Sequence, residues 1–186
     1  MLRRRYYRTG RQRYSNETTT IGFQMSGQIN AGVNFPENET SPGVVSDRGI
    51  TVVPTATIQG TRKVKNITLK ITGQYLTAPV FCALVYVPEG TLPNALNLGN
   101  GTSFYEPNQN VITSFVLPQT VQFNVSGTTT EAIPTGQTTY TISTRLARNL
   151  ASGDRVVLIM AAGGNLLYSP DTKGYICGTA NYAIKY

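Results

Sequence analysis

Arginine and tyrosine are interleaved through the first fourteen residues, MLRRRYYRTGRQRY, and these side chains have the clearest chemical potential in the chain. Six of the fourteen residues are arginine, three are tyrosine, and none is acidic. A guanidinium group binds phosphate oxygens through paired hydrogen bonds, and a tyrosine ring is a platform on which an unpaired base can stack. The segment therefore predicts binding to a single-stranded nucleic acid, and it is also compatible with a nuclear-localisation signal or a solubilising tail.

The positive charge of the chain is concentrated in this segment. The whole chain has 16 Lys and Arg against 9 Asp and Glu, a net charge of +7. Residues 15–186 hold ten of the basic side chains and all nine acidic ones, which leaves them a net charge of only +1. A segment this charged cannot bury enough apolar surface to offset its ordering entropy. We therefore expect an arm over residues 1–16 and one folded domain over residues 17–186.

A second, smaller basic cluster precedes an alternating stretch in which Ile67, Leu69 and Ile71 share one face. The alternation predicts a strand, and by its parity Lys63 and Lys65 lie on the face of Ile67. We expect this cluster to extend beyond the edge of the core and to face the same side as the arm. A strand end that is simply solvated would have the same sequence pattern. The predicted nucleic-acid-binding residues are Arg3, Arg4, Arg5, Tyr6, Tyr7, Arg8, Arg11, Arg13, Tyr14, Arg62, Lys63 and Lys65.

Residue types needed for common catalytic and metal sites are missing from the sequence. There is no histidine, so no Ser-His, Cys-His or H-E-x-x-H arrangement is possible. Cys82 and Cys177 have no nearby cysteine partner for zinc, and each stands in an apolar run, so we expect two buried free thiols. No apolar run reaches about 18 residues, the length that a membrane helix needs. We expect no enzyme activity, no cofactor, no metal and no membrane partner.

Short apolar or alternating stretches, separated by Gly- and Pro-rich turns, predict an all-β sandwich of roughly seven to nine antiparallel strands. The stretches 80–87 and 156–162 are continuously apolar, so we expect central strands that are covered on both faces. One helical turn is expected around Leu146–Leu150 and another at 92–99. The candidates for the outermost loops are 30–49, 88–110 and 127–138. The expected core residues are Ile21, Phe23, Ile67, Leu69, Ile71, Leu84, Phe123, Val125, Ile142, Val157, Ile159 and Ile184.

Three stretches resemble, in order, strands of the capsid proteins of circovirus-like viruses, which have small circular single-stranded DNA genomes. They are GTRKVKNITLKITG at 60–73, VFCALVYVPEG with the following TLPNALN at 80–97, and the closing GTANYAIKY at 178–186. The closing stretch also resembles the last strand of satellite-virus coats. The arm is shorter than a typical circovirus arm and the body is small, which leaves open a plant satellite virus with an RNA genome.

The resemblance implies an eight-stranded antiparallel jelly roll with a short basic N-terminal arm. It also implies self-assembly into a T=1 icosahedral shell of about 60 copies with the arms inside. The implied partners are other copies of the chain, a single-stranded viral genome, DNA rather than RNA, and a host receptor. The implied locations are the virion and, during assembly, the host nucleus.

Two other classes of protein fit parts of the sequence. A soluble carbohydrate-binding or adhesin-type β-sandwich explains the Thr-, Asn- and Gly-rich loops, but it does not explain six arginines at the N-terminus. A monomeric single-strand-binding protein with an OB barrel is the other alternative, but that fold is shorter and carries its basic residues on the barrel face.

Overall fold

The computed structural model describes residues 14–32, 34–35, 49–57, 60–91, 110–126, 129–145 and 147–186. All regular structure in these ranges is β-strand, which confirms the expected all-β fold. In the described part of the chain, no helix has the length and apolarity that a membrane crossing requires. The expected helical turn at 92–99 and residues 1–13 of the arm lie outside the described residues.

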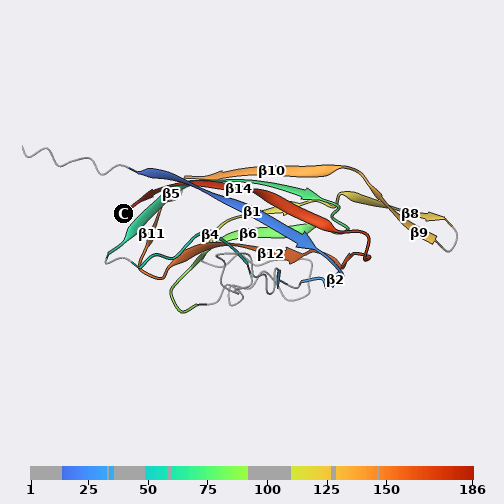
Figure 1. The fold of residues 1–186 in the computed structure, drawn as a ribbon, viewed down its shortest axis with the longest axis horizontal. Helices are drawn as coiled ribbons and strands as arrows, with labels where there is room; N and C mark the ends of the chain where they lie inside the picture. The colour runs from blue at the N-terminus through green and yellow to red at the C-terminus, as the bar shows by residue number, and fades with distance from the viewer. Residues whose placement is uncertain are drawn as a thin grey trace, which may run out of the picture.

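The strands form two five-stranded antiparallel sheets that lie face to face (Figure 1). The strands of the first sheet are β1 (Ser15–Met25), β14 (Gly174–Lys185), β5 (Arg62–Gln74), β10 (Gln137–Thr144) and the short β11 (Arg148–Leu150), which pairs with β5. The strands of the second sheet are β3 (Asn34–Phe35), β4 (Ile50–Val53), β12 (Arg155–Ala162), β6 (Val80–Val87) and β7 (Val111–Leu117). Two separate ribbons pair β2 (Gln28–Ile29) with β13 (Leu166–Leu167) and β8 (Val121–Ser126) with β9 (Thr129–Pro134).

The strand order is that of a jelly roll. The first sheet runs β1-β14-β5-β10, and in the second sheet β12 pairs with β4 and β6, and β6 with β7. The first long strand therefore pairs with the last, and the following strands pair as β4 with β12, β5 with β10 and β6 with β7. This nested pairing is the double Greek key that defines the eight-stranded jelly roll. The expected fold is confirmed, with the short ribbons and β3 and β11 added to the eight main strands.

The main hydrophobic core lies between the two sheets. Ile71 of β5 and Ile176 of β14 face Leu84 of β6 and Leu158 of β12, and all four side chains are fully buried. A second buried cluster, which includes Val85 and Ile159, lies on the other face of β6 and β12. Both strands are therefore covered on both faces, as their continuous apolar sequences predicted. Of the expected core residues, those buried are Ile21, Ile67, Leu69, Ile71, Leu84, Val157, Ile159 and Ile184, while Phe23 and Ile142 are partly buried against the core.

The expected burial of Phe123 and Val125 is wrong, because their strand leaves the sandwich. Their side chains are 48% and 67% exposed. They belong to β8, whose only partner among the described strands is β9, and the ribbon of these two strands projects from one end of the sandwich (Figure 1). The alternation of β8 correctly predicted a strand, but it did not predict that the strand leaves the core.

Two smaller expectations are also wrong. Residues 148–150, part of the expected helical turn around Leu146–Leu150, form β11 and pair with β5. Both cysteines are free, but only Cys82 is buried, and burial raises the pKa of its thiol. Cys177 is exposed because its side chain points away from the core. Its neighbours in β14 lie on the core side: Ile176 is buried, and Gly178 packs closely on β5.

Candidate nucleic-acid interface

The described residues of the predicted site lie at one end of the first sheet. Tyr14 precedes β1, and Arg62, Lys63 and Lys65 open β5. The arm residues Arg3, Arg4, Arg5, Tyr6, Tyr7, Arg8, Arg11 and Arg13 lie outside the described residues, so their predicted role stays a prediction.

A β-bulge in β5 determines which way its basic side chains point. Asn66 has a φ of 54°, in the left-handed region that asparagine tolerates better than most residues. The pairing with β14 shifts by one residue around it, since Asn181 pairs with Thr68 but Ala183 pairs with Lys65. Val64 and Ile67 are consequently both buried, although their parity differs. The prediction that Lys63 and Lys65 share the face of Ile67 is therefore wrong, and both lysines lie on the outward face of the sheet.

Arg62 faces the interior, which corrects the prediction that it joins the two lysines on the side of the arm. Its side chain is only 1% exposed. Its guanidinium donates hydrogen bonds of 2.9 Å from Nη1 to the carbonyl of Pro54 and 3.0 Å from Nη2 to the carbonyl of Asp154. These bonds tie the start of β5 to the end of β4 and to the turn before β12. The physical role of Arg62 is to hold this end of the sandwich together.

The carboxylate of Asp154 organises the same turn. Its Oδ2 accepts hydrogen bonds of 2.7 Å from the hydroxyl of Tyr86 and from the amide of Ala151, and its Oδ1 accepts one of 3.1 Å from the amide of Glu89. Burial alone would raise the pKa of Asp154. The three hydrogen bonds and the charge of Arg62 outweigh that effect and hold the pKa below its usual value of 3.8.

We expect Asp154→Asn to destabilise the fold by about 2 to 3 kcal/mol at neutral pH, because an amide cannot accept all three hydrogen bonds. Since the folded-state pKa is lowered, the stabilisation by Asp154 is present above about pH 3.8 and is lost as the pH falls through the folded-state value. Urea unfolding measured from pH 7 down to progressively lower pH should therefore show a stability difference between the Asp154→Asn variant and the natural chain that shrinks in acid. The control is Tyr86→Phe, which loses a single hydrogen bond and should cost about 1 kcal/mol. An Asp154→Asn variant with unchanged stability at pH 7 would contradict this account.

The outward face of the first sheet is polar, positively charged and free of acidic side chains among the described residues. Its strands present threonine, serine and asparagine. Cross-strand hydrogen bonds join the hydroxyls of Thr72 and Thr139 at 2.9 Å, and the hydroxyl of Thr18 donates one of 2.6 Å to Oδ1 of Asn181. The charged residues of this face are Lys63, Lys65, Lys70 and Lys185. A face that combines cations with hydroxyl and amide groups is suited to phosphate oxygens.

The arm joins the body on this lysine-bearing face. The Lys65 ammonium lies 3.9 Å from the centre of the Tyr14 ring, a cation–π contact. The next residue, Ser15, starts β1 and pairs with Ile184 at the end of β14. The structure thus brings together Tyr14 and Lys65, two residues that the sequence placed in the same functional set.

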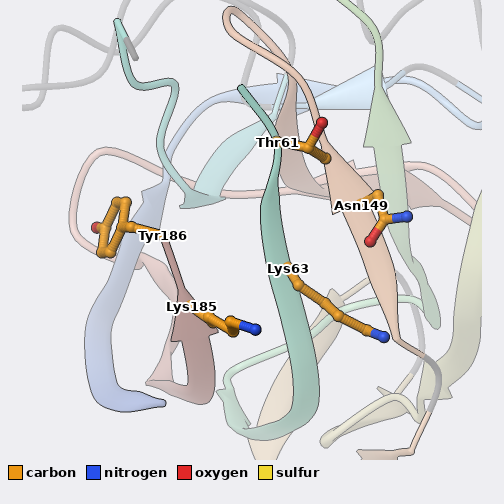
Figure 2. A pocket seen from close by; sticks show the side chains of 5 residues that line it. All are labelled: Thr61, Lys63, Asn149, Lys185 and Tyr186. Atoms are coloured by element: carbon orange, nitrogen blue, oxygen red, sulfur yellow. The ribbon is translucent and has the colours of Figure 1, made fainter. Parts of the chain in front are cut away.

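A pocket at this end of the sheet contains residues that sequence reasoning missed. It has a volume of about 410 Å³ and is lined by Thr61, Lys63, Asn149, Lys185 and Tyr186 (Figure 2). Only Lys63 was among the predicted site residues. The others come from β11, from the end of β14 and from the residue before β5, and their proximity depends on cross-strand register, which one sequence does not reveal.

Comparison with known proteins adds little to this description. No family model matches the chain, and no curated protein matches it. Two solved structures of infectious bursal disease virus, from the Gx and Gt strains, align with 91% and 89% of this chain at 8% and 9% identity. The chain spans only 41% and 40% of the length of those chains, and the TM-scores are 0.22 and 0.14. The jelly-roll assignment rests instead on the strand order.

Proposed function

We propose that this chain is a structural capsid protein whose body builds a small icosahedral shell and whose arginine-rich arm packages a single-stranded nucleic acid. The observation that carries the proposal is the point at which the arginine-rich segment meets the body. A segment with six arginines and no acidic residue joins the body at Tyr14, on the sheet face that bears the lysines. Jelly rolls occur in viral capsids, lectins and cupins, so the fold alone does not decide between these functions.

The division of charge supports a packaging role. A nearly neutral body can pack against its own copies without strong self-repulsion, while a concentrated basic arm can be directed to the inside of a shell. In a shell of about 60 copies, the arms would bring roughly 360 arginines into one cavity, where they offset genome phosphates. Packaging that tolerates any sequence requires charge and stacking rather than readout of base edges, and the arm has both arginines and tyrosines.

The finer parts of the proposal follow from the resemblance to circovirus-like capsids. They are a T=1 shell, a single-stranded DNA genome, assembly in the host nucleus, and a structural rather than catalytic role. A satellite-virus coat with an RNA genome is the alternative within the same class. Digesting the nucleic acid extracted from purified particles with DNase or RNase distinguishes these two genomes.

Sizing the purified full-length chain tests the proposal directly. Sixty copies of a 20.2 kDa chain give a particle of about 1.2 MDa, which light scattering and electron microscopy would detect. After external nuclease treatment, the particles should keep an absorbance ratio at 260 to 280 nm typical of protected nucleic acid. A monomer or dimer without nucleic acid would contradict the proposal and favour a carbohydrate-binding sandwich.

A further inference from the structure

The pocket at the arm end of the first sheet is built by three directly paired strands. Lys185 of β14 pairs with Lys63 of β5, and Lys63 pairs in turn with Asn149 of β11. Residues that are directly opposite each other in a sheet point to the same face, so these three side chains form one row across the outward surface. Figure 2 shows Lys185 extending toward β5, with Thr61, Lys63 and Asn149 beyond it and the Tyr186 ring at the other edge.

Lys63 and Lys185 carry like charges at directly opposed positions of neighbouring strands. This arrangement is unfavourable when no counter-ion lies between the two charges. Among the described residues, the strands around the two lysines present no acidic side chain on the outward face. An anion bound between the two ammonium groups would turn this repulsion into attraction. The electrostatics of the row therefore favour a bound anion.

The remaining pocket residues indicate which anion. The hydroxyl of Thr61 and the amide of Asn149 can donate hydrogen bonds to phosphate oxygens, and the ring of Tyr186, 63% exposed, offers a stacking surface for a base. A volume of about 410 Å³ accommodates a nucleotide. Lys65 lies two residues further along the same face of β5, about 7 Å away, beside Tyr14. A strand of nucleic acid that leaves the pocket therefore meets a further cation next to the arm.

We propose that this pocket binds a phosphate group of a single-stranded nucleic acid, with Lys63 and Lys185 neutralising its charge. The inference rests on the proposed function and deepens it, because it assigns a phosphate-binding site to the folded body in addition to the arm. Lysines act here as point charges that accept many phosphate orientations, which suits binding without sequence preference.

The test compares two full-length double variants that lose the same charge. Lys63→Gln with Lys185→Gln empties the pocket of cations, while Arg145→Gln with Lys173→Gln removes two exposed cations that belong neither to the pocket nor to the lysines of the outward face. Anisotropy of a fluorescent oligothymidylate is measured on dissociated subunits over a range of salt concentrations. We expect the pocket variant to bind about fourfold more weakly at moderate salt, with a log–log salt slope shallower by about 0.7, the value for one phosphate on a single strand. The control variant should keep the slope of the natural chain.

The pocket variant should also remain folded. Removing two opposed like charges should leave the thermal midpoint unchanged or slightly raised, so weaker binding cannot be attributed to unfolding. A variant with Tyr186→Ala should lose about fivefold in affinity through lost stacking, whereas Tyr186→Phe should bind like the natural chain.

The outcomes separate this inference from the proposed function. Equal effects of the two double variants, or no effect of either, would overturn the pocket while leaving shell formation and packaging by the arm intact.

Competition with inorganic phosphate and with a nucleoside monophosphate distinguishes the source of the phosphate group. If inorganic phosphate or the nucleoside monophosphate displaces the oligothymidylate at a concentration below the Kd of the oligothymidylate itself, the pocket is a site for the free ligand. The assignment to nucleic acid is then overturned. Loss of particles with normal oligothymidylate binding would instead overturn the shell and leave the pocket standing.

Discussion

Replacing Gly178 by alanine should prevent the protein from accumulating in folded form. Gly178 lies in β14, between β1 and β5, and pairs with Ile71. A Cβ atom at this position would overlap the backbone carbonyl oxygen of Lys70 and lie 3.0 Å from the Cα of Ile71. Both contacts are with backbone of the neighbouring strand, so no side chain can rotate away. Relief requires the two central strands to separate, and we expect a cost above about 3 kcal/mol, a large share of the stability of a domain.

The matched control is Gly22→Ala on the neighbouring strand β1. Gly22 pairs with Cys177, the residue before Gly178, and a Cβ atom there would meet nothing within 4 Å. Alanine at this position should leave stability unchanged or raise it by about 0.5 to 1 kcal/mol, because glycine is unfavourable in a strand. The measurement is the urea midpoint, or the soluble yield where a variant does not purify. Equal midpoints for the two variants would show that β14 and β5 are not packed as closely as the structure describes.

Local sequence patterns predicted most of the strands because each pattern is a property of a few adjacent residues. The alternation around Leu69 and the continuous apolar runs of β6 and β12 identified three main strands and the way they are buried. The alternation of β8 was equally clear, yet Phe123 and Val125 are exposed. Alternation shows that a strand has one apolar face, but it does not show what covers that face.

The candidate site was predictable only in part, because its geometry depends on irregularity and register. One bulge at Asn66 reverses the parity of β5, so the lysines point outward and Arg62 points inward. An asparagine within a strand was a signal for that bulge. The pairing of Lys63 with Lys185 joins residues more than a hundred positions apart, and no local pattern reports such a pairing. The concentration of charge in the arm, in contrast, is visible directly in the sequence.

Removing the arm should abolish most nucleic-acid binding while leaving the fold intact. A protein that begins at Ser15 keeps every described strand and the whole described core, since β1 starts at that residue. Six arginine contacts with single-stranded phosphates would give the full chain a slope of log affinity against log salt of roughly −4, from about 0.7 per contact. The truncated protein should keep only the shallow slope contributed by the lysines of the body, and its particles should be empty or poorly formed.

The chemistry of the arm is resolved by two variants of the full chain. Replacing the six arginines with lysines preserves charge but not the paired hydrogen bonds of the guanidinium, so packaging should weaken only in part. Replacing Tyr6, Tyr7 and Tyr14 with alanine removes stacking, so affinity should fall while the salt slope stays nearly unchanged. The deciding measurement is the absorbance ratio at 260 to 280 nm in purified particles with and without the arm. If truncated shells hold as much nucleic acid as intact ones, packaging resides in the lysine-bearing face of the body, and the arm has another role.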